Sequence, residues 1–387
     1  MITLLLALIY VCFISLGLPD SLLGSAWPIL HAEINVPVSF AGIVSTVISA
    51  GTIVSSLLSD RLLRKWGAGK ITAVSTALTA VALFGFSISG EFWMLVLWAI
   101  PYGLGAGAVD AVLNNYVALH YKPQHMSWLH CFWGVGASIS PYIMSFALVK
   151  LENWSAGYLI VSIIQIVLSI LIFLSLPLWK KGIDAGEGEE KTGESQALSF
   201  KEILKIPGAL PCFVTFFGYC ALEMTSSLWA SSYLVAVRDV EPEIASAFAS
   251  LFYIGITLGR GANGFLAIKY KDGTLIRVGL AIIAVGILFV ALPLPSIVAL
   301  IGFIVIGLGC APVYPCIIHM TPDLFGKERS QAMIGVQMAA AYSGFLLVPP
   351  LVGVIGDCFG ISLLPLCLAI LLALIVAMHE MVVKKTK

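Results

Sequence analysis

The sequence predicts an all-α membrane protein of twelve transmembrane helices, arranged as two six-helix bundles. Hydrophobic residues make up 59% of the 387 residues and charged residues only 11%, and the mean hydropathy is +1.01, unlike a soluble globular chain. Clusters of Gly, Pro and charged residues divide the chain into about twelve apolar stretches, each near the twenty residues that a bilayer requires. One long polar segment separates the first six stretches from the last six.

The expected spans follow one another in order. They cover residues 2–31, 38–59, 70–89, 92–120, 127–149 and 154–178 in the first half, and 206–236, 243–267, 274–293, 296–320, 329–351 and 361–383 in the second. The first span follows Met1 without a basic segment and is too long for the apolar region of a secretory signal, so we interpret it as retained.

The polar segment between Lys180 and Lys205 is rich in Gly and Glu and has no apolar periodicity before its end, SFKEIL, where we expect a short interfacial helix. We therefore predict an N-terminal bundle over residues 1–178, a cytoplasmic linker over 179–205 and a C-terminal bundle over 206–387.

The distribution of basic residues predicts the orientation. Eighteen of the 21 Lys and Arg lie in or next to the loops after even-numbered spans or in the C-terminal tail, whereas only Lys150 and Arg238 lie on the opposite side and Arg260 lies deep within a span. Cytoplasmic loops carry the excess of Lys and Arg. Both termini should therefore face the cytoplasm, in a cell membrane that we expect to be a bacterial plasma membrane.

The two halves repeat in sequence. The segment Gly103-Leu-Gly-Ala-Gly-Ala-Val-Asp110 matches Gly307-Leu-Gly-Cys-Ala-Pro-Val-Tyr314 at an offset of 204 residues, and the same offset aligns Gly51 with Gly255. Because six spans separate the copies, both enter the membrane from the same side, which predicts a parallel repeat about an axis along the membrane normal. In such folds the binding site is expected near the midplane.

Three acidic residues lie well away from the ends of the expected spans: Asp20, Asp110 and Glu223. A charge in the middle of a span costs about 2.5–3.5 kcal/mol even on the lenient insertion scale, so such residues usually mark a substrate or ion path. A carboxyl group in a poorly hydrated cleft can take up and release a proton, and all three are therefore candidates for proton coupling. A static interhelical hydrogen bond is the alternative for each.

Several polar neighbours support a site for a polar solute. Asp110 and Asn114 are four residues apart, which places both on one helix face. Arg260, three residues before Asn263, cannot lose its proton and should pair with an acid or a carbonyl, as a gate or as charge balance. His130 is expected either to contact the solute or to bond a carbonyl as a buried imidazole.

Aromatic rings at suitable depths could stack on a sugar, although in membranes they also fill space or anchor at interfaces. The residues expected to line the substrate site are Asp20, Trp27, Asp110, Asn114, His130, Trp133, Glu223, Trp229, Asn263, Tyr314 and Gln337.

The loop after the second span, Ser56-Leu-Leu-Ser-Asp60-Arg61-Leu-Leu-Arg64-Lys65-Trp66-Gly67, resembles that of the major facilitator superfamily, as do the twelve spans and the repeat. The family usually has Gly where this chain has Ser56 and Leu63, but the pattern of Asp60 and Arg64 is intact. We expect Asp60, Arg61, Arg64 and Lys65 to form a cytoplasmic latch between the halves, and to act in gating together with Arg260.

Within the superfamily, the chain resembles the fucose:proton symporter family along most of its length. The resemblance is carried by Gly17-Leu-Pro-Asp20-Ser-Leu-Leu-Gly-Ser-Ala-Trp27-Pro28, Asp110-Ala-Val-Leu-Asn114-Asn115, Trp128-Leu-His130-Cys-Phe132-Trp-Gly134-Val-Gly136 and Gln337-Met-Ala-Ala-Ala-Tyr342. In that family an acid in the first span and an acid in the fourth serve sugar binding and proton coupling, and a polar residue opens the fifth. Asp20, Asp110 and His130 occupy those places. The family's usual residues at the last two are Glu and Gln, so the resemblance does not identify the sugar.

The sequence thus predicts a secondary active transporter that takes up a monosaccharide or similar polar solute with protons by alternating access. No ATP-binding motif is present, so an ion gradient should supply the energy. Proton-coupled efflux of drug-like compounds and sodium-coupled sugar transport are the alternatives.

A membrane-embedded receptor or enzyme would need an effector domain or a cluster such as HExxH or GxSxG, which the sequence lacks. The expected partners are the solute, the proton and the bilayer. We expect a monomer that is not an enzyme, without cofactor, metal or nucleic acid.

Overall fold

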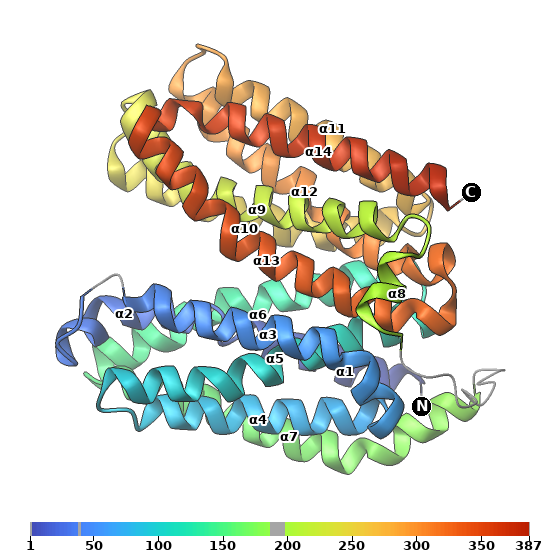
Figure 1. Cartoon of the computed structure of the whole chain (residues 1–387). Coiled ribbons are helices and arrows are strands. Elements are labelled where there is room, and N and C mark those ends of the chain that lie inside the picture. The colour runs from blue at the N-terminus through green and yellow to red at the C-terminus, as the bar shows by residue number, and fades with distance from the viewer. Residues whose placement is uncertain (1, 38–39, 186–197, 387) are drawn as a thin grey trace. The chain divides into compact units, whose positions relative to one another are not determined.

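The computed structural model describes residues 2–37, 40–185 and 198–386, and every element in these ranges is a helix (Figure 1). The helices before the polar segment are α1 (Ile2–Gly17), α2 (Leu22–Glu33), α3 (Ala41–Trp66), α4 (Ala68–Ser87), α5 (Phe92–His120), α6 (Pro123–Lys150) and α7 (Trp154–Ala185). Those after it are α8 (Phe200–Leu204), α9 (Ala209–Arg238), α10 (Pro242–Leu266), α11 (Asp272–Ala291), α12 (Ser296–Phe325), α13 (Lys327–Phe359) and α14 (Leu364–Lys385), the last preceded by the 3₁₀ turn Ile361–Leu363.

The described residues contain eleven helical segments that are long and apolar enough to cross a membrane, with α1 and α2 forming one of them. The 25-residue helix α10 occupies the place of the remaining expected span. Large apolar side chains such as Leu174, Leu258 and Phe265 are exposed on the helices, as expected for surfaces that face lipid rather than water. The predicted all-α membrane fold is confirmed, and the chain is a multi-pass membrane protein.

The first span is broken at Pro19. Residues 18–21 form turns between α1 and α2 because proline has no N–H group to bond the carbonyl of Ser15, four residues earlier. The side chain of Gln165 on α7 replaces that donor, with Nε2 donating to the Ser15 carbonyl oxygen at 2.5 Å. The Ser15 hydroxyl in turn donates to Gln165 Oε1 at 3.3 Å. The break is therefore stabilised by an amide from the sixth span.

The described residues form two compact units. Unit 1 comprises the described parts of Met1–Tyr116 and Phe132–Ala197, and unit 2 those of Val117–Cys131 and Leu198–Lys387. The segment Val117–Cys131, which the sequence order places in the first half, thus packs with the second. The predicted bundle limits at residues 178 and 206 remain predictions.

The predicted linker is partly helical. Helix α7 continues to Ala185, beyond the expected end of the sixth span, and α8 lies where the short helix was expected. Ser199 caps α8: its hydroxyl accepts a hydrogen bond from the backbone N–H of Glu202, whose side chain bonds back to the Ser199 N–H. Residues 186–197 of the linker lie outside the described residues.

The sequence repeat is reproduced in the packing of each unit. In unit 1 a side chain on Gly103 would stand 2.2 Å from the backbone oxygen of Ile48, and in unit 2 one on Gly307 would stand 2.6 Å from that of Phe252. Both residues of the second pair are offset by 204 from the first pair. The glycines of α5 and α12 therefore allow the same close helix approach against α3 and α10.

A second pair of equivalent positions repeats the contact with the residue sizes exchanged. In unit 1 the indole of Trp98 on α5 covers Gly85 on α4, where a side chain would stand 2.0 Å from the ring. The positions 204 residues later are Phe289 on α11 and Gly302 on α12, and a side chain on Gly302 would stand 3.0 Å from the Cβ of Phe289. In both units one large and one minimal residue fill this contact.

Candidate functional site

In unit 1 the break in the first span presents the carboxyl group of Asp20. Its side chain is exposed, and Oδ2 accepts a hydrogen bond from Trp133 Nε1 on α6 at 2.9 Å. A second hydrogen bond to this carboxyl comes from the hydroxyl of Tyr102 on α5. The Ser21 hydroxyl donates to the carbonyl of Ala137 at 3.1 Å, which holds the break against α6. Two neutral aromatic donors from different helices thus orient one exposed carboxylate.

Asp110 and Asn114 share a buried face of α5, as their spacing predicted. The Asn114 amide donates to Asp110 Oδ1 at 2.8 Å and to the Asp110 carbonyl at 3.0 Å. Asp20 and Asp110 lie close enough for their carboxyl groups to interact electrostatically. Unit 1 therefore brings together the two acids of the first and fourth spans.

In unit 2 the acid is paired with a cation. Arg260 Nη2 on α10 lies 3.7 Å from Glu223 Oε2 on α9, and the two residues are only 3% and 6% exposed. The hydroxyl of Tyr219 donates to the same carboxylate oxygen, and it also lies 2.9 Å from the carbonyl oxygen of Cys310 on α12. Arg260 thus pairs with an acid, as expected, and its role in gating remains a prediction.

Tyr314, the counterpart of Asp110 in the repeat, stands at the centre of an aromatic cluster in unit 2. Its ring lies 4.7 Å from the rings of His130 and Phe216, and the guanidinium carbon of Arg260 lies 5.8 Å from its centroid. Its hydroxyl lies 3.2 Å from the sulfur of Met338. The ring face is thus placed for a cation–π contact, and His130 is held edge-on to it.

The structure places Trp27 in the apolar core of unit 1, where it is buried with Leu22, Leu30 and Val44. Trp229, in unit 2, donates its indole N–H to the carbonyl of Pro349 at 2.9 Å and covers Gly353. Both contacts are those of space-filling rings.

Two of the predicted polar ligands bond other helices of unit 2. Gln337 is fully buried, and its Nε2 donates to Thr321 Oγ1 at 2.9 Å and to Cys212 Sγ at 3.0 Å. Asn263 Nδ2 donates to the hydroxyl of Ser127 at 2.7 Å. Their amide donors serve the internal packing of unit 2, and their expected contact with a solute remains a prediction.

The charged residues that follow the second span lie at the end of α3. Arg64 Nε bonds both oxygens of Asp60, at 3.1 and 3.2 Å, across one turn of the helix. Arg61 and Lys65 are exposed. This ion pair lies within one helix, and the latch between the halves remains a prediction.

Three residues that form hydrogen bonds to Asp20, to the Ser15 carbonyl and to Glu223 were not predicted. They are Tyr102, Gln165 and Tyr219. Tyr219 precedes Glu223 by four residues, so the same spacing argument that linked Asp110 to Asn114 could have found it. Gln165 was detectable as a lone amide in an apolar span. Nothing local identifies Tyr102. Within the described residues no group of His, Cys, Asp and Glu side chains is placed to hold a metal ion.

Comparison with known proteins places the fold. The chain is 24% identical over 398 residues to Bypass of stop codon protein 6 of Saccharomyces cerevisiae, covering 94% of this chain and 79% of that protein. It is 21% identical over 346 residues to the Glucose/mannose transporter GlcP of Bacillus subtilis, covering 87% and 84%. The crystal structure of FucP in the outward conformation superimposes with a TM-score of 0.79 at 16% identity, covering 97% of both chains.

The family model of the Major Facilitator Superfamily matches residues 9–349 and 212–386, which together span nearly the whole sequence. The eleven candidate spans and the long helix α10 of the described residues agree with this match, as does the repeated packing within each unit. The chain therefore belongs to the Major Facilitator Superfamily and is a transporter.

Proposed function

We propose that this transporter takes up a monosaccharide or a similar polar solute together with protons, by alternating access. The observation that carries the proposal is the exposed carboxylate of Asp20, held by the neutral donors Trp133 and Tyr102 and close to Asp110. Such a group offers hydrogen-bond acceptors to a solute and a place for a proton.

The chemistry around Asp20 suits a sugar. A sugar presents several hydroxyl groups, which bond carboxylate oxygens and amides, and apolar ring faces, which stack on aromatic side chains. Unit 1 supplies the carboxyl groups of Asp20 and Asp110, the amide of Asn114 and the ring of Trp133. A cavity for drug-like compounds would be more apolar, which argues against the efflux alternative.

The same acids support proton coupling. Asp20 and Asp110 carry like charges when both are ionised, and uptake of one proton removes their repulsion. The donors that hold Asp20 are neutral, so its protonation breaks no ion pair with them. When the two conformations of the transporter bind the proton with different affinities, uptake of the proton shifts the equilibrium between them. Freed carbonyls and carboxylates also suit sodium, which stays the alternative ion.

The names of the relatives agree with this proposal. One relative is a glucose/mannose transporter, and FucP is described in another crystal structure as the E. coli fucose:proton symporter. At 21% and 16% identity these names do not identify the sugar for this chain.

Uptake into energised membrane vesicles tests the proposal. We expect a labelled hexose or pentose from a panel to accumulate against its gradient when an inward proton gradient is imposed, and to equilibrate only when the gradient is collapsed. Vesicles without the protein are the control. Accumulation that follows a sodium gradient instead would identify sodium as the coupling ion. Failure of every sugar in the panel to enter would reject a sugar as the substrate.

We also propose that both termini face the cytoplasm. A reporter that works only in the cytoplasm should be active when fused after Glu194 or after Lys387, because the basic loops lie on that side. Activity of an export-dependent reporter at either position would reverse the orientation.

A further inference from the structure

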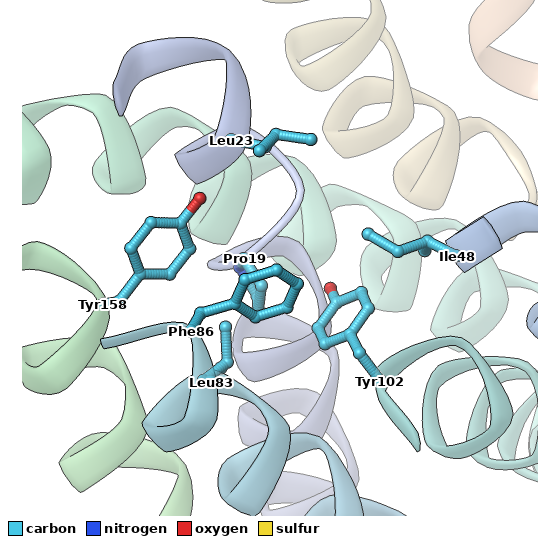
Figure 2. A pocket seen from close by; sticks show the side chains of 7 residues that line it. All are labelled: Pro19, Leu23, Ile48, Leu83, Phe86, Tyr102 and Tyr158. Atoms are coloured by element: carbon cyan, nitrogen blue, oxygen red, sulfur yellow. The ribbon is translucent and has the colours of Figure 1, made fainter. Parts of the chain in front are cut away.

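Unit 1 contains a small cavity beside the break at Pro19. It has a volume of about 20 Å³ and is lined by Pro19, Phe86, Tyr102 and Tyr158, among others (Figure 2). A cavity needs roughly 10–15 Å³ to hold one water molecule, so this one is far too small to enclose a sugar. We therefore expect a sugar to rest against exposed side chains, and unit 2 has one that is suited to it.

Tyr253 lies near the middle of α10 and is 45% exposed. Its hydroxyl donates a hydrogen bond to Ser227 Oγ on α9 at 3.0 Å, and the Ser227 hydroxyl donates to the Met224 carbonyl at 3.0 Å. The Tyr253 ring also makes an edge contact with the buried ring of Phe252, with 5.6 Å between the centroids. The ring is thus held at both its hydroxyl and its edge, while much of its surface stays exposed.

Tyr253 lies on the face of α10 that carries the charged residue of the helix. Arg260 and Gly264 follow it by seven and eleven residues, and such spacings return to the same face because a turn takes 3.6 residues. Arg260 is buried against Glu223, and a side chain on Gly264 would stand 2.0 Å from Trp128 Nε1, in the segment Val117–Cys131 that packs with unit 2. This face is therefore covered at Arg260 and Gly264 but open at Tyr253.

The apolar stripe of α10 lies elsewhere on the helix. Its exposed residues Ile254 and Leu258 are displaced from Tyr253 by about a third of a turn. Tyr253 also lies close enough to Glu223 to interact with it electrostatically, and Ser227 follows Glu223 by one turn of α9. The exposed ring thus adjoins the polar centre of unit 2 and not the stripe that faces lipid.

We propose that the exposed ring of Tyr253 is the surface of unit 2 on which the sugar stacks. Sugar rings present apolar C–H faces, which pack on aromatic rings, and their hydroxyl groups remain for the acids. Ser227 is a positioning residue, because it fixes the Tyr253 hydroxyl and with it the plane of the ring. This inference rests on the proposed transport of a sugar and adds the feature that unit 2 recognises, the apolar face of a sugar ring.

Sugar affinity of the purified protein in detergent, measured by isothermal titration, tests the contact. D-glucose is the first probe, followed by D-mannose and D-galactose if it does not bind. Tyr253→Leu should weaken the affinity by roughly three- to tenfold, the range of one aromatic contact. Tyr253→Phe and Ser227→Ala keep the ring and should stay within about threefold. Tyr270→Leu is the control, since it removes a tyrosine that is 53% exposed beyond the end of α10, and it should leave the affinity unchanged.

The open-chain alcohol of the same sugar gives a readout that a general packing defect would not produce. D-glucitol keeps the hydroxyl groups of D-glucose but has no ring face to stack, as has the corresponding alcohol of each other hexose. The wild type should prefer the hexose, and Tyr253→Leu should reduce this preference by roughly threefold or more. A general defect would weaken both compounds alike.

Thiol modification tests the direction of the ring without a transport assay. Tyr253→Cys and Leu258→Cys are compared in lipid nanodiscs, each with the exposed Cys358 replaced by Ser, and the Cys358→Ser protein gives the background of the other cysteines. A water-soluble methanethiosulfonate should modify Tyr253→Cys and not Leu258→Cys, because the reactive thiolate forms in water and not in lipid. A saturating concentration of the sugar should slow the modification of Tyr253→Cys several-fold.

The outcomes separate this inference from the proposed function. If Tyr253→Cys reacts no faster than Leu258→Cys, the ring faces lipid, and the inference is overturned while sugar transport stands. Modification that the sugar does not slow, with Tyr253→Leu binding sugar like Tyr270→Leu, overturns it as well. If no sugar of the panel binds or enters with the wild-type protein, the proposed function itself has failed, and this inference fails with it.

Discussion

In unit 1, Asp20 accepts hydrogen bonds from the neutral side chains of Trp133 and Tyr102, whereas in unit 2 Glu223 lies 3.7 Å from the guanidinium of Arg260. A proton taken up by Asp20 breaks no ion pair with these neutral donors. The acid of unit 2 is already balanced by a cation that cannot lose its proton. Intramembrane acids of one chain can thus differ in role according to their partners: we assign exchange of protons and solute to unit 1 and a fixed or gating ion pair to unit 2.

The largest expected effect is on the stability of unit 2. Glu223→Gln should destabilise the protein by about 3–5 kcal/mol, because it removes the anion that balances the buried charge of Arg260. The double variant Glu223→Gln with Arg260→Met should recover much of this loss. Thermal unfolding of the purified protein in detergent measures both.

The exposed pair of Arg277 and Glu380 is the matched control, since its side chains are 51% and 49% exposed. Arg277→Gln should cost less than about 1 kcal/mol. Equal losses at the two pairs would mean that the Glu223 pair is not isolated from solvent, and our contrast between the units would be lost.

The second largest effect is expected on transport when the carboxyl group of Asp20 is removed. Asp20→Ala should abolish both uphill uptake and sugar exchange, because each lost hydrogen bond to a charged group is typically about 1.5–3 kcal/mol, roughly ten- to a hundredfold in affinity. Exchange of labelled sugar across the membrane of proteoliposomes measures the loss. Exchange at the wild-type rate in Asp20→Ala would remove this residue from the solute site.

Asp110→Asn should separate coupling from binding. The amide resembles the protonated carboxyl in charge and nearly in shape, and its oxygen can still accept the hydrogen bond from Asn114. We expect the accumulation ratio to fall to about one under a proton gradient while sugar exchange continues. Undiminished accumulation would exclude Asp110 as the coupling residue and leave Asp20 and Glu223.

The smallest expected effect concerns the ion pair on α3. Asp60→Asn should change stability by no more than about 0.5 kcal/mol, because pairs one turn apart on a helix contribute little. Turnover should nevertheless slow several-fold, with sugar affinity in detergent within a few-fold, if the charge biases a conformational equilibrium as proposed. Lys201→Gln on α8 is the control. A large loss of affinity with normal turnover would contradict this role.

Chain length and hydropathy were enough to predict the helices, because a bilayer imposes span length directly on the sequence. Pairs on one helix were also predictable, as Asp110 with Asn114 illustrates. The aromatic residues were not: in a membrane bundle both the lipid face and the packed face are apolar, so periodicity did not separate Trp27, which lies in the core, from Trp133, which bonds Asp20.

Hydrogen-bond partners on other helices could not be predicted from the sequence either. The Ser15 carbonyl that Pro19 leaves without a helical donor is bonded by Gln165, which is 150 residues away in the sequence. Gln337 was expected near the solute, yet Thr321 and Cys212 satisfy its amide. Such choices depend on tertiary packing, which no local pattern encodes.

The exchanged sizes at Gly85 with Trp98 and at Phe289 with Gly302 limit how the halves can be recombined. A chimaera with α12 in the place of α5 would set Gly302 against Gly85 and open a void. The reverse graft would drive the Trp98 indole into Phe289. The two halves share one architecture, but at this contact a helix of one half cannot replace its counterpart in the other. A graft between the halves must therefore carry both members of a pair together.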